Sequence, residues 1–157
     1  MSKLSDMLVE QIFGTCAINV KYHTDIEPLK QIAIGDAIDV RAARDIDLLY
    51  MENTKIPLGF SCQLTYGYCA LLFPRSSTFD KFGIVQTNSF GLIDESFCGN
   101  DDEWMMPVIA MRTDVHIKKN DRIGQFIIIP KMPSVKFEAV DDLKNENRGG
   151  FGGTGTN

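Results

Sequence analysis

Arg75, Ser76 and Ser77 follow the apolar run YCALLF and precede a possible helix. A guanidinium group, two hydroxyls and the free amides at a helix start can together hold phosphate oxygens. A serine pair before a helix is also the ordinary sequence of a helix cap. The segment by itself therefore leaves both a phosphate site and a plain cap open.

Two aspartates are candidates for water activation or metal binding. Asp94 follows the apolar pair Leu92-Ile93, so we expect it at a strand end, where partial burial would raise its basicity and let it activate water. Asp39 lies inside the strand-like run AIDV, where a carboxylate can join a magnesium shell directly or through water. For Asp94 the spacing alone favours an ordinary strand-terminating turn. For Asp39 a solvent-facing position on an edge strand fits the local sequence equally well.

The segment NDRIGQFIIIP combines a turn signal with a long apolar strand. Gln125 has the apolar neighbours Ile123 and Phe126, so its amide needs a hydrogen-bond partner if it is buried. Arg122 is expected to form a structural ion pair with Asp121 or another acidic neighbour.

The C-terminal stretch ENRGGFGGTGTN is rich in glycine. Composition alone predicts a flexible end of the chain. The functional alternative is a flap that orders on a ligand, with backbone amides and the side chains of Arg148 and Thr154 as donors and Phe151 as a stacking surface.

Short strands with turn signals between them must position these residues. The strand-like runs are AINVKY, IAI, AIDV, YCALLF, MMPVIAM, RIGQFIII and SVKFEAV. An amphipathic helix is predicted over residues 2–13 and a second short helix over residues 76–82, capped by Ser76 or Ser77. This order of elements predicts a β-sandwich or barrel.

The bulk properties of the chain indicate one folded domain. It has 157 residues, a net charge of −5 and a pI near 5.0, which argues against binding long nucleic acid. No run is long enough for a signal sequence or a membrane span, so a cytoplasmic protein without membrane contact is expected. The four cysteines and two histidines lack the spacing of zinc ligands, and reduced, partly buried thiols are expected.

Five segments, AIDVRAA, PRSSTF, NSFGLIDESFCG, NDRIGQFIIIP and RGGFGGTG, resemble in this order the five motifs of the trimeric dUTPase family. The resemblance implies a mainly β, jelly-roll-like barrel over residues 1–145. It also implies a homotrimer in which a flexible arm, residues 146–157, closes over an active site of a neighbouring subunit.

By the same resemblance the reaction is hydrolysis of dUTP to dUMP and pyrophosphate, which limits uracil in DNA and supplies dUMP for thymidylate synthesis. Asp94 matches the acid that activates the water attacking the α-phosphorus, and Asp39 would bind Mg²⁺ through water. The phosphate chain or the attacking water would be held by Arg75, Ser76, Ser77 and Gln125.

The resemblance also implies how the base and sugar are read. Asn88 would help to read the uracil edge, Phe97 would pack against the deoxyribose, and the hairpin after Gly99 would supply backbone groups. From the arm, Phe151 would stack on uracil, and the remaining contacts would come from Arg148, Gly152, Gly153 and Thr154.

Some positions differ from the family pattern. Ala37, Phe97, Thr78-Phe79 and Asn120 replace more common residues without removing a reacting group. Glu146 stands where the family often has the tail arginine, so Arg148 is predicted to contact the γ-phosphate. The segment 100–104 is longer and more acidic than the compact hairpin expected there.

Two other functions compete with this hypothesis. A dCTP deaminase shares the fold, but it needs a glutamate in the strand after the Phe97 segment, and residues 105–111 contain none. A dUTPase-like trimer that acts by binding a regulator is the second alternative, and the retained Asp39, Asp94 and Gln125 argue against a loss of catalysis.

Overall fold

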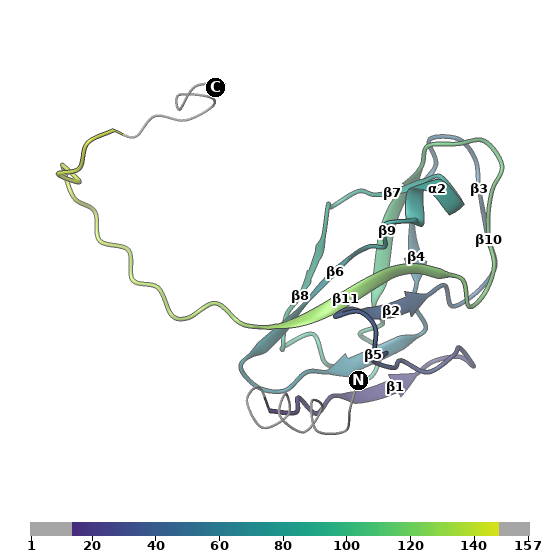
Figure 1. The fold of residues 1–157 in the computed structure, drawn as a ribbon, viewed down its shortest axis with the longest axis horizontal. Helices are drawn as coiled ribbons and strands as arrows, with labels where there is room; N and C mark the ends of the chain where they lie inside the picture. The colour runs from purple at the N-terminus through teal and green to yellow at the C-terminus, as the bar shows by residue number, and fades with distance from the viewer. Residues whose placement is uncertain (1–13, 148–157) are drawn as a thin grey trace.

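Strands dominate residues 14–147, the part of the chain that this computed structural model describes (Figure 1). In chain order they are β1 (Asn19–Tyr22), β2 (Ile38–Arg41), β3 (Ile46–Leu48), β4 (Asn53–Pro57), β5 (Phe60–Gln63), β6 (Tyr68–Pro74), β7 (Ile84–Gln86), β8 (Gly91–Ile93), β9 (Met105–Ala110), β10 (Val115–Ile117) and β11 (Arg122–Pro130). One short helix, α2 (Thr78–Phe82), follows β6. The predicted mainly β class is confirmed.

A four-stranded antiparallel sheet in the order β2-β11-β6-β8 carries Asp39 and Gln125, and the loops at its strand ends carry Arg75 and Asp94. Gln125 on β11 lies opposite Asp39 on β2 and opposite Phe73 on β6. Because β11 pairs on both sides, its apolar run is largely shielded, as expected for a central strand.

The remaining strands form three further sheets, β4-β9-β7, β1-β5 and β10-β3. The expected closed barrel is therefore corrected to separate sheets packed on one core. The physical reason is that β2 and β8, of four and three residues, end the main sheet without pairing to each other among the described residues.

The core lies between these sheets and centres on Trp104. Its ring centroid lies 5.2 Å from that of Phe60 and 5.1 Å from that of Phe126, in tilted and edge-to-face arrangements. All three side chains are almost fully buried. Offset and edge-on contacts of this kind are the favourable geometries for aromatic rings.

A β-bulge near the start of β11 shapes the site. The register shifts between Arg122 and Gly124, so the extra residue, Ile123, turns into the core. A Cβ at Gly124 would lie 3.0 Å from Met106 Sδ and 3.2 Å from the Phe73 carbonyl oxygen. Only glycine fits this close approach without a shift of its neighbours.

Five of the seven predicted strands are confirmed, in β1, β2, β6, β9 and β11. The runs IAI (residues 32–34) and SVKFEAV (residues 134–140) are not strands. Both segments are largely exposed and have no partner strand in the described part of the chain. An alternating apolar pattern forms a strand only where a neighbouring strand pairs with it. The sequence prediction also missed β3, β4, β5, β7 and β10, which have three to five residues each, whereas β8 was expected as the strand that ends before Asp94.

Residues 131–147 run as an extended arm away from the sheets (Figure 1). The arm exposes several apolar side chains, namely Met132, Val135, Phe137, Val140 and Leu143. A chain segment that exposes several apolar residues is suited to packing on another surface.

The short internal helix is confirmed but begins two residues later than predicted, at Thr78. Ser77 occupies the N-cap position without a side-chain capping hydrogen bond. The predicted helix over residues 2–13 lies outside the described residues. No helix within residues 14–147 is both long and apolar enough to cross a membrane.

Candidate active site

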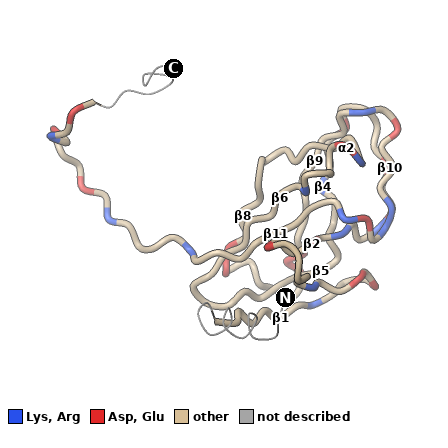
Figure 2. The backbone as a smooth tube through the Cα atoms, in the orientation of Figure 1, with Lys and Arg blue, Asp and Glu red and all other residues tan. Residues whose placement is uncertain are grey.

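Asp39 forms the centre of an ion-pair cluster at one end of the main sheet. Its Oδ1 lies 2.6 Å from Nε of Arg75, and its Oδ2 accepts a hydrogen bond of 3.0 Å from Arg122. The Arg75 contact is an ion pair without hydrogen-bond alignment of the Nε proton. Figure 2 shows residues of both charges close together around β2 and the start of β11.

Of the two expectations for Asp39, the structure bears only on the edge position. Asp39 lies on an edge strand of the main sheet, yet its side chain is only 21% exposed because the arginines cover it. Arg122 forms the predicted ion pair, but its partner is Asp39 across the strand pair and not its sequence neighbour Asp121.

Thr78 fixes the loop that carries Arg75, Ser76 and Ser77. Its buried hydroxyl accepts a hydrogen bond from the Arg75 backbone N–H at 2.9 Å and donates one to the Ile123 carbonyl oxygen at 2.9 Å. The loop is thereby tied to the bulge of β11. Sequence reasoning treated Thr78 only as a departure from the family pattern, although a threonine at a helix start is a signal for such local bonding.

Gln125 has the hydrogen-bond partner that its apolar neighbours required. Its Nε2 donates to the Pro74 carbonyl oxygen at 3.3 Å, and its side chain is half-buried. Because Pro74 directly precedes Arg75, this bond places the amide beside the ion-pair cluster. The structure thus brings Asp39, Arg75 and Gln125 together, with Ser76 and Ser77 on the adjoining loop.

Asp94 lies directly after β8, at the predicted strand end. Its side chain is exposed in the single chain, so the expected partial burial is wrong there. The reason is that β8 is the edge strand of the sheet and the turn after it faces outward. The Phe97 N–H closes this turn on the Asp94 carbonyl oxygen at 3.1 Å, and the Phe97 ring is 39% exposed.

Within a single chain, Asp94 lies far from the ion-pair cluster of Asp39, Arg75 and Arg122. Ile93 is opposite Ala70 on β6, whereas Gln125 is opposite Phe73 on the other side of that strand. Strand rise and spacing place Asp94 roughly 15 Å from Gln125. The residues expected to act on one phosphate chain therefore form two separate groups in a single chain.

Asn88 lies in the turn before β8 and is exposed. Its side-chain oxygen accepts a 2.8 Å hydrogen bond from Gln86. Gln86 is buried and was not among the predicted site residues. The other candidate residues, Arg148, Phe151, Gly152, Gly153 and Thr154, lie outside the described residues.

The acidic segment 100–103 is used to build the turn after Phe97. Asp102 accepts a hydrogen bond from the Gly99 N–H at 2.6 Å, and Glu103 accepts one from the Gly59 N–H at 2.8 Å. Lys21 on β1 donates to the Asn100 carbonyl oxygen at 2.9 Å. The extra acidic residues therefore anchor this turn to the body of the domain.

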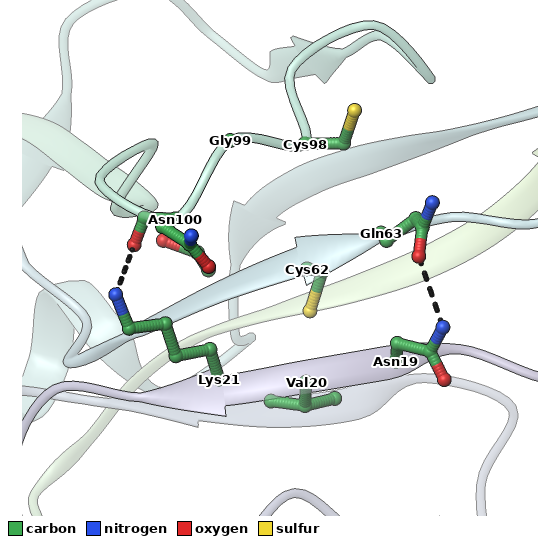
Figure 3. Close-up of a pocket in the computed structure, with 9 residues that line it drawn as sticks. Asn19, Val20, Lys21, Cys62, Gln63, Cys98, Gly99 and Asn100 are labelled. Carbon is green, nitrogen blue, oxygen red and sulfur yellow. Dashed lines mark hydrogen bonds between the residues drawn. The ribbon is translucent and has the colours of Figure 1, made fainter.

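A shallow cavity of about 180 Å³ lies between this turn and the β1-β5 pair (Figure 3). Cys62 and Cys98 both line it, but their sulfur atoms point in opposite directions (Figure 3). All four cysteines are free thiols, as expected, with Cys62 and Cys69 buried. Burial raises the pKa of Cys62 to about 12, so this thiol is not a nucleophile at neutral pH.

A dUTPase family model matches residues 25–156. The chain belongs to the dUTPase family. The match encloses every candidate site residue from Asp39 to Thr154, and membership makes the chain a hydrolase of nucleotide metabolism.

Relatives in the dUTPase family cover most of the chain. The SPbeta prophage-derived deoxyuridine 5'-triphosphate nucleotidohydrolase YosS of Bacillus subtilis is 47% identical over 140 residues, which are 88% of this chain and 98% of that protein. The deoxyuridine 5'-triphosphate nucleotidohydrolase of Gamma-proteobacterium EBAC31A08 is 40% identical over 126 residues, covering 76% and 88% of the two chains.

Solved dUTPase structures have the same fold. The Staphylococcus bacteriophage 80alpha dUTPase with dUPNHPP superposes with a TM-score of 0.76 at 18% identity, covering 89% of this chain and 99% of that one. The Streptococcus mutans dUTPase gives a TM-score of 0.67 at 22% identity, covering 74% and 98%. A phage phi11 dUTPase mutant with a TM-score of 0.67, at 16% identity over 82% and 99% of the two chains, is described with a structural Mg(II) ion.

Proposed function

We propose that this dUTPase hydrolyses dUTP to dUMP and pyrophosphate through attack of an Asp94-activated water on the α-phosphorus. The observation that carries the proposal is the convergence of Asp39, Arg75 and Gln125 at one end of the main sheet. The activity would limit uracil in DNA and supply dUMP for thymidylate synthesis, with the cytoplasm as its place of action.

Arg75 and the Ser76-Ser77 loop would bind the phosphate chain. The Asp39 ion pair and the Thr78 hydroxyl hold this loop before substrate arrives. Phosphoryl transfer depends mainly on positioning and charge neutralisation, so a loop fixed in advance lowers the cost of reaching the transition state.

Gln125 would position the attacking water. Its Nε2 is committed to the Pro74 carbonyl oxygen, which directs the amide oxygen away from that strand. An amide oxygen is an acceptor and can hold a water by one of its protons. Asp94 would take the other proton as the water attacks.

The residues present fit Mg²⁺ held chiefly by the substrate. Within residues 14–147 no three His, Cys, Asp or Glu side chains converge on one point. A site with one or two carboxylates, here Asp39 beside Arg75 and the proposed Asp94 of another subunit, suits a magnesium ion that keeps several waters and binds phosphate oxygens. When bound, the ion would neutralise charge on the phosphate chain, with Asp39 contacting it through water.

A homotrimer would complete the site. By strand spacing, Asp94 lies roughly 15 Å from Gln125 in one chain. Asp94 of one subunit would therefore activate water at the site formed by Arg75 and Gln125 of another subunit. The extended segment 131–147 supports this arrangement, because it runs away from the sheets of its own chain and exposes apolar side chains.

The C-terminal end of the chain, residues 146–157, would close over the site of a neighbouring subunit. Arg148 would contact the γ-phosphate, Phe151 would stack on uracil, and Gly152, Gly153 and Thr154 would supply further donors. Glu146 would repel a phosphate, which is why Arg148 takes that role. Arg148→Ala is expected to lower kcat/KM for dUTP by about tenfold or more, and a change within about twofold would contradict the assignment.

Asn88 and Phe97 would contact the nucleoside. Phe97 retains an aromatic surface for the deoxyribose and, with 39% of its residue surface exposed, has room to pack against it. The turn after Gly99 would present backbone groups to uracil, and Asp102 and Glu103 hold that turn in place.

Pyrophosphate release from dUTP, UTP, dCTP and dTTP with Mg²⁺ tests the reaction, with wild type beside Asp94→Asn. Hydrolysis confined to dUTP and lost in the variant supports the proposal. No turnover of any nucleotide would contradict it, and ammonia release from dCTP would identify a deaminase instead.

Subunit mixing tests the shared site. Asp94→Asn and Arg75→Ala chains are each expected to be inactive, whereas co-refolded mixtures contain sites with both wild-type residues. Recovery of activity in the mixture supports a site built between subunits. An inactive mixture of well-folded trimers, or an active monomer in sedimentation, would contradict it.

A further inference from the structure

Gln86, the last residue of β7, has a buried amide directed at Asn88. It is 4% exposed. Its Nε2 donates two hydrogen bonds, one to the Leu72 carbonyl oxygen at 3.2 Å and one to Asn88 Oδ1 at 2.8 Å. Both protons of this nitrogen are therefore in use.

These two bonds determine which end of the Asn88 amide faces outward. The Leu72 carbonyl can only accept a hydrogen bond, so the nitrogen end of Gln86 must face it. The same nitrogen then requires an acceptor from Asn88, which is Oδ1. The two N–H groups of Asn88 Nδ2 are left to point elsewhere.

The backbone around Asn88 is fixed on both sides. The Thr87 N–H donates to the Pro107 carbonyl oxygen at 3.0 Å, and the Phe90 N–H donates to that of Asn88 at 2.6 Å. The Asn88 side-chain amide could still rotate, and its hydrogen bond with Gln86 prevents this rotation. A Cβ built at Gly91 would lie 3.7 Å from Nδ2, so glycine there leaves this donor uncovered.

We infer that Gln86 sets the base selectivity of this dUTPase by holding Asn88 as a hydrogen-bond donor toward a pyrimidine carbonyl. The inference rests on the proposed function, in which Asn88 faces the base. Uracil carries a carbonyl at C4, whereas cytosine carries an amino group, which is itself a donor. The fixed N–H donor of Asn88 pairs with the uracil carbonyl and is left unpaired against the cytosine amino group. Gln86 is thus a positioning residue that acts through Asn88.

Gln86→Glu in the full chain provides the sharpest test. A carboxylate only accepts hydrogen bonds, so Asn88 would turn its nitrogen inward and present its oxygen to the base. The ratio of kcat/KM for dUTP to that for dCTP is expected to fall by about tenfold or more. Gln86→Met, of similar size, frees the Asn88 amide to rotate, and a smaller fall in the same ratio is expected.

Gln31→Met is the matched control, because Gln31 is exposed and lies far along the chain from Asn88. It should keep the wild-type ratio. A purely structural role for Gln86 would lower activity on both substrates equally and leave the ratio unchanged. If Gln86→Glu does not fold, Gln86→Met decides the question by the same ratio.

The two proposals fail in distinguishable ways. Wild-type enzyme that does not hydrolyse dUTP would contradict the proposed function. Wild-type enzyme that prefers dUTP, together with folded Gln86 variants that keep its dUTP-to-dCTP ratio, would overturn the role of Gln86 and leave the proposed function standing.

Discussion

Asp39 Oδ1 and Arg75 Nε lie 2.6 Å apart, although the strand β11 separates β2, which carries Asp39, from β6, which leads into Arg75. The Asp39 carboxylate therefore links β2 to the end of β6, the two strands that flank β11. It also receives Arg122 from the start of β11 itself. All three strands of this part of the sheet contribute to one charge cluster.

Asp39→Asn should impair activity more than stability. The amide cannot neutralise Arg75, so the guanidinium loses its fixed orientation, and kcat/KM for dUTP is expected to fall by about tenfold to hundredfold. The free energy of unfolding should fall by about 1 kcal/mol or less, since the pair is partly exposed. Arg122→Met is the control: it leaves the Arg75 contact intact, and an equally large loss of activity there would contradict the special role of the Arg75 pair.

Thr78→Val should destabilise the protein and displace the phosphate loop. Valine has nearly the same shape but leaves the Arg75 N–H and the buried Ile123 carbonyl without their hydroxyl partner. The expected cost is about 1–3 kcal/mol in urea denaturation, with a higher KM for dUTP. Thr78→Ser keeps the hydroxyl and should retain most of the stability; a serine variant as unstable as the valine variant would show that the methyl group, not the hydroxyl, matters.

Replacement of Trp104 separates volume from polarity in the core. Trp104→Ala should cost about 3–5 kcal/mol because it opens a cavity between Phe60 and Phe126. Trp104→Phe should cost clearly less, since it keeps a ring and removes a buried indole N–H that finds no hydrogen-bond partner among residues 14–147. Equal losses in denaturant unfolding for the two variants would contradict this account.

Glu95 and Lys131 couple the turn after Asp94 to the start of the arm. Glu95 accepts hydrogen bonds from Lys131 Nζ and, at 2.8 Å, from the Gly67 N–H. The hydrogen bond from Lys131, followed by that from Gly67, lowers the pKa of Glu95, and the hydrogen bond to Glu95 raises the pKa of Lys131. Lys131 also lies 4.5 Å from the centre of the Tyr66 ring.

The pH dependence of stability follows from the signs of these shifts. A lowered carboxyl pKa contributes stability above its ordinary value of 4.5 and loses it as the pH falls through the folded-state value. A raised lysine pKa contributes below its ordinary value of 10.5 and loses it as the pH rises through the folded-state value. Glu95→Gln should thus lower Tm at neutral pH, and its difference from wild type should shrink as the pH falls below 4.5.

Glu138→Gln is the matched control for this pair. Glu138 also pairs with a lysine, Lys136, but on the exposed arm. Its replacement should leave Tm unchanged at every pH. A difference between Glu95→Gln and wild type that stays constant with pH would show that the effect is not electrostatic.

The sequence by itself determined the long strands and the chemistry of the motifs. YCALLF and RIGQFIIIP are long apolar runs that only a buried strand or helix can use, and they form β6 and β11. The need of Gln125 for a hydrogen-bond partner followed from its apolar neighbours, and Pro74 supplies that partner. These properties are local, so the order of residue types along the chain was sufficient.

Tertiary structure decided everything that depends on which strands meet. SVKFEAV alternates like a strand but has no partner in the described chain, whereas the three residues of β8 become a strand because β6 lies beside them. The pairing of Asp39 with Arg75 and the hydrogen bond of Gln86 to the Leu72 carbonyl oxygen join residues far apart in the sequence. Such contacts depend on register across the sheet, and register is fixed by the packing of the whole core, not by the neighbours of a residue in sequence.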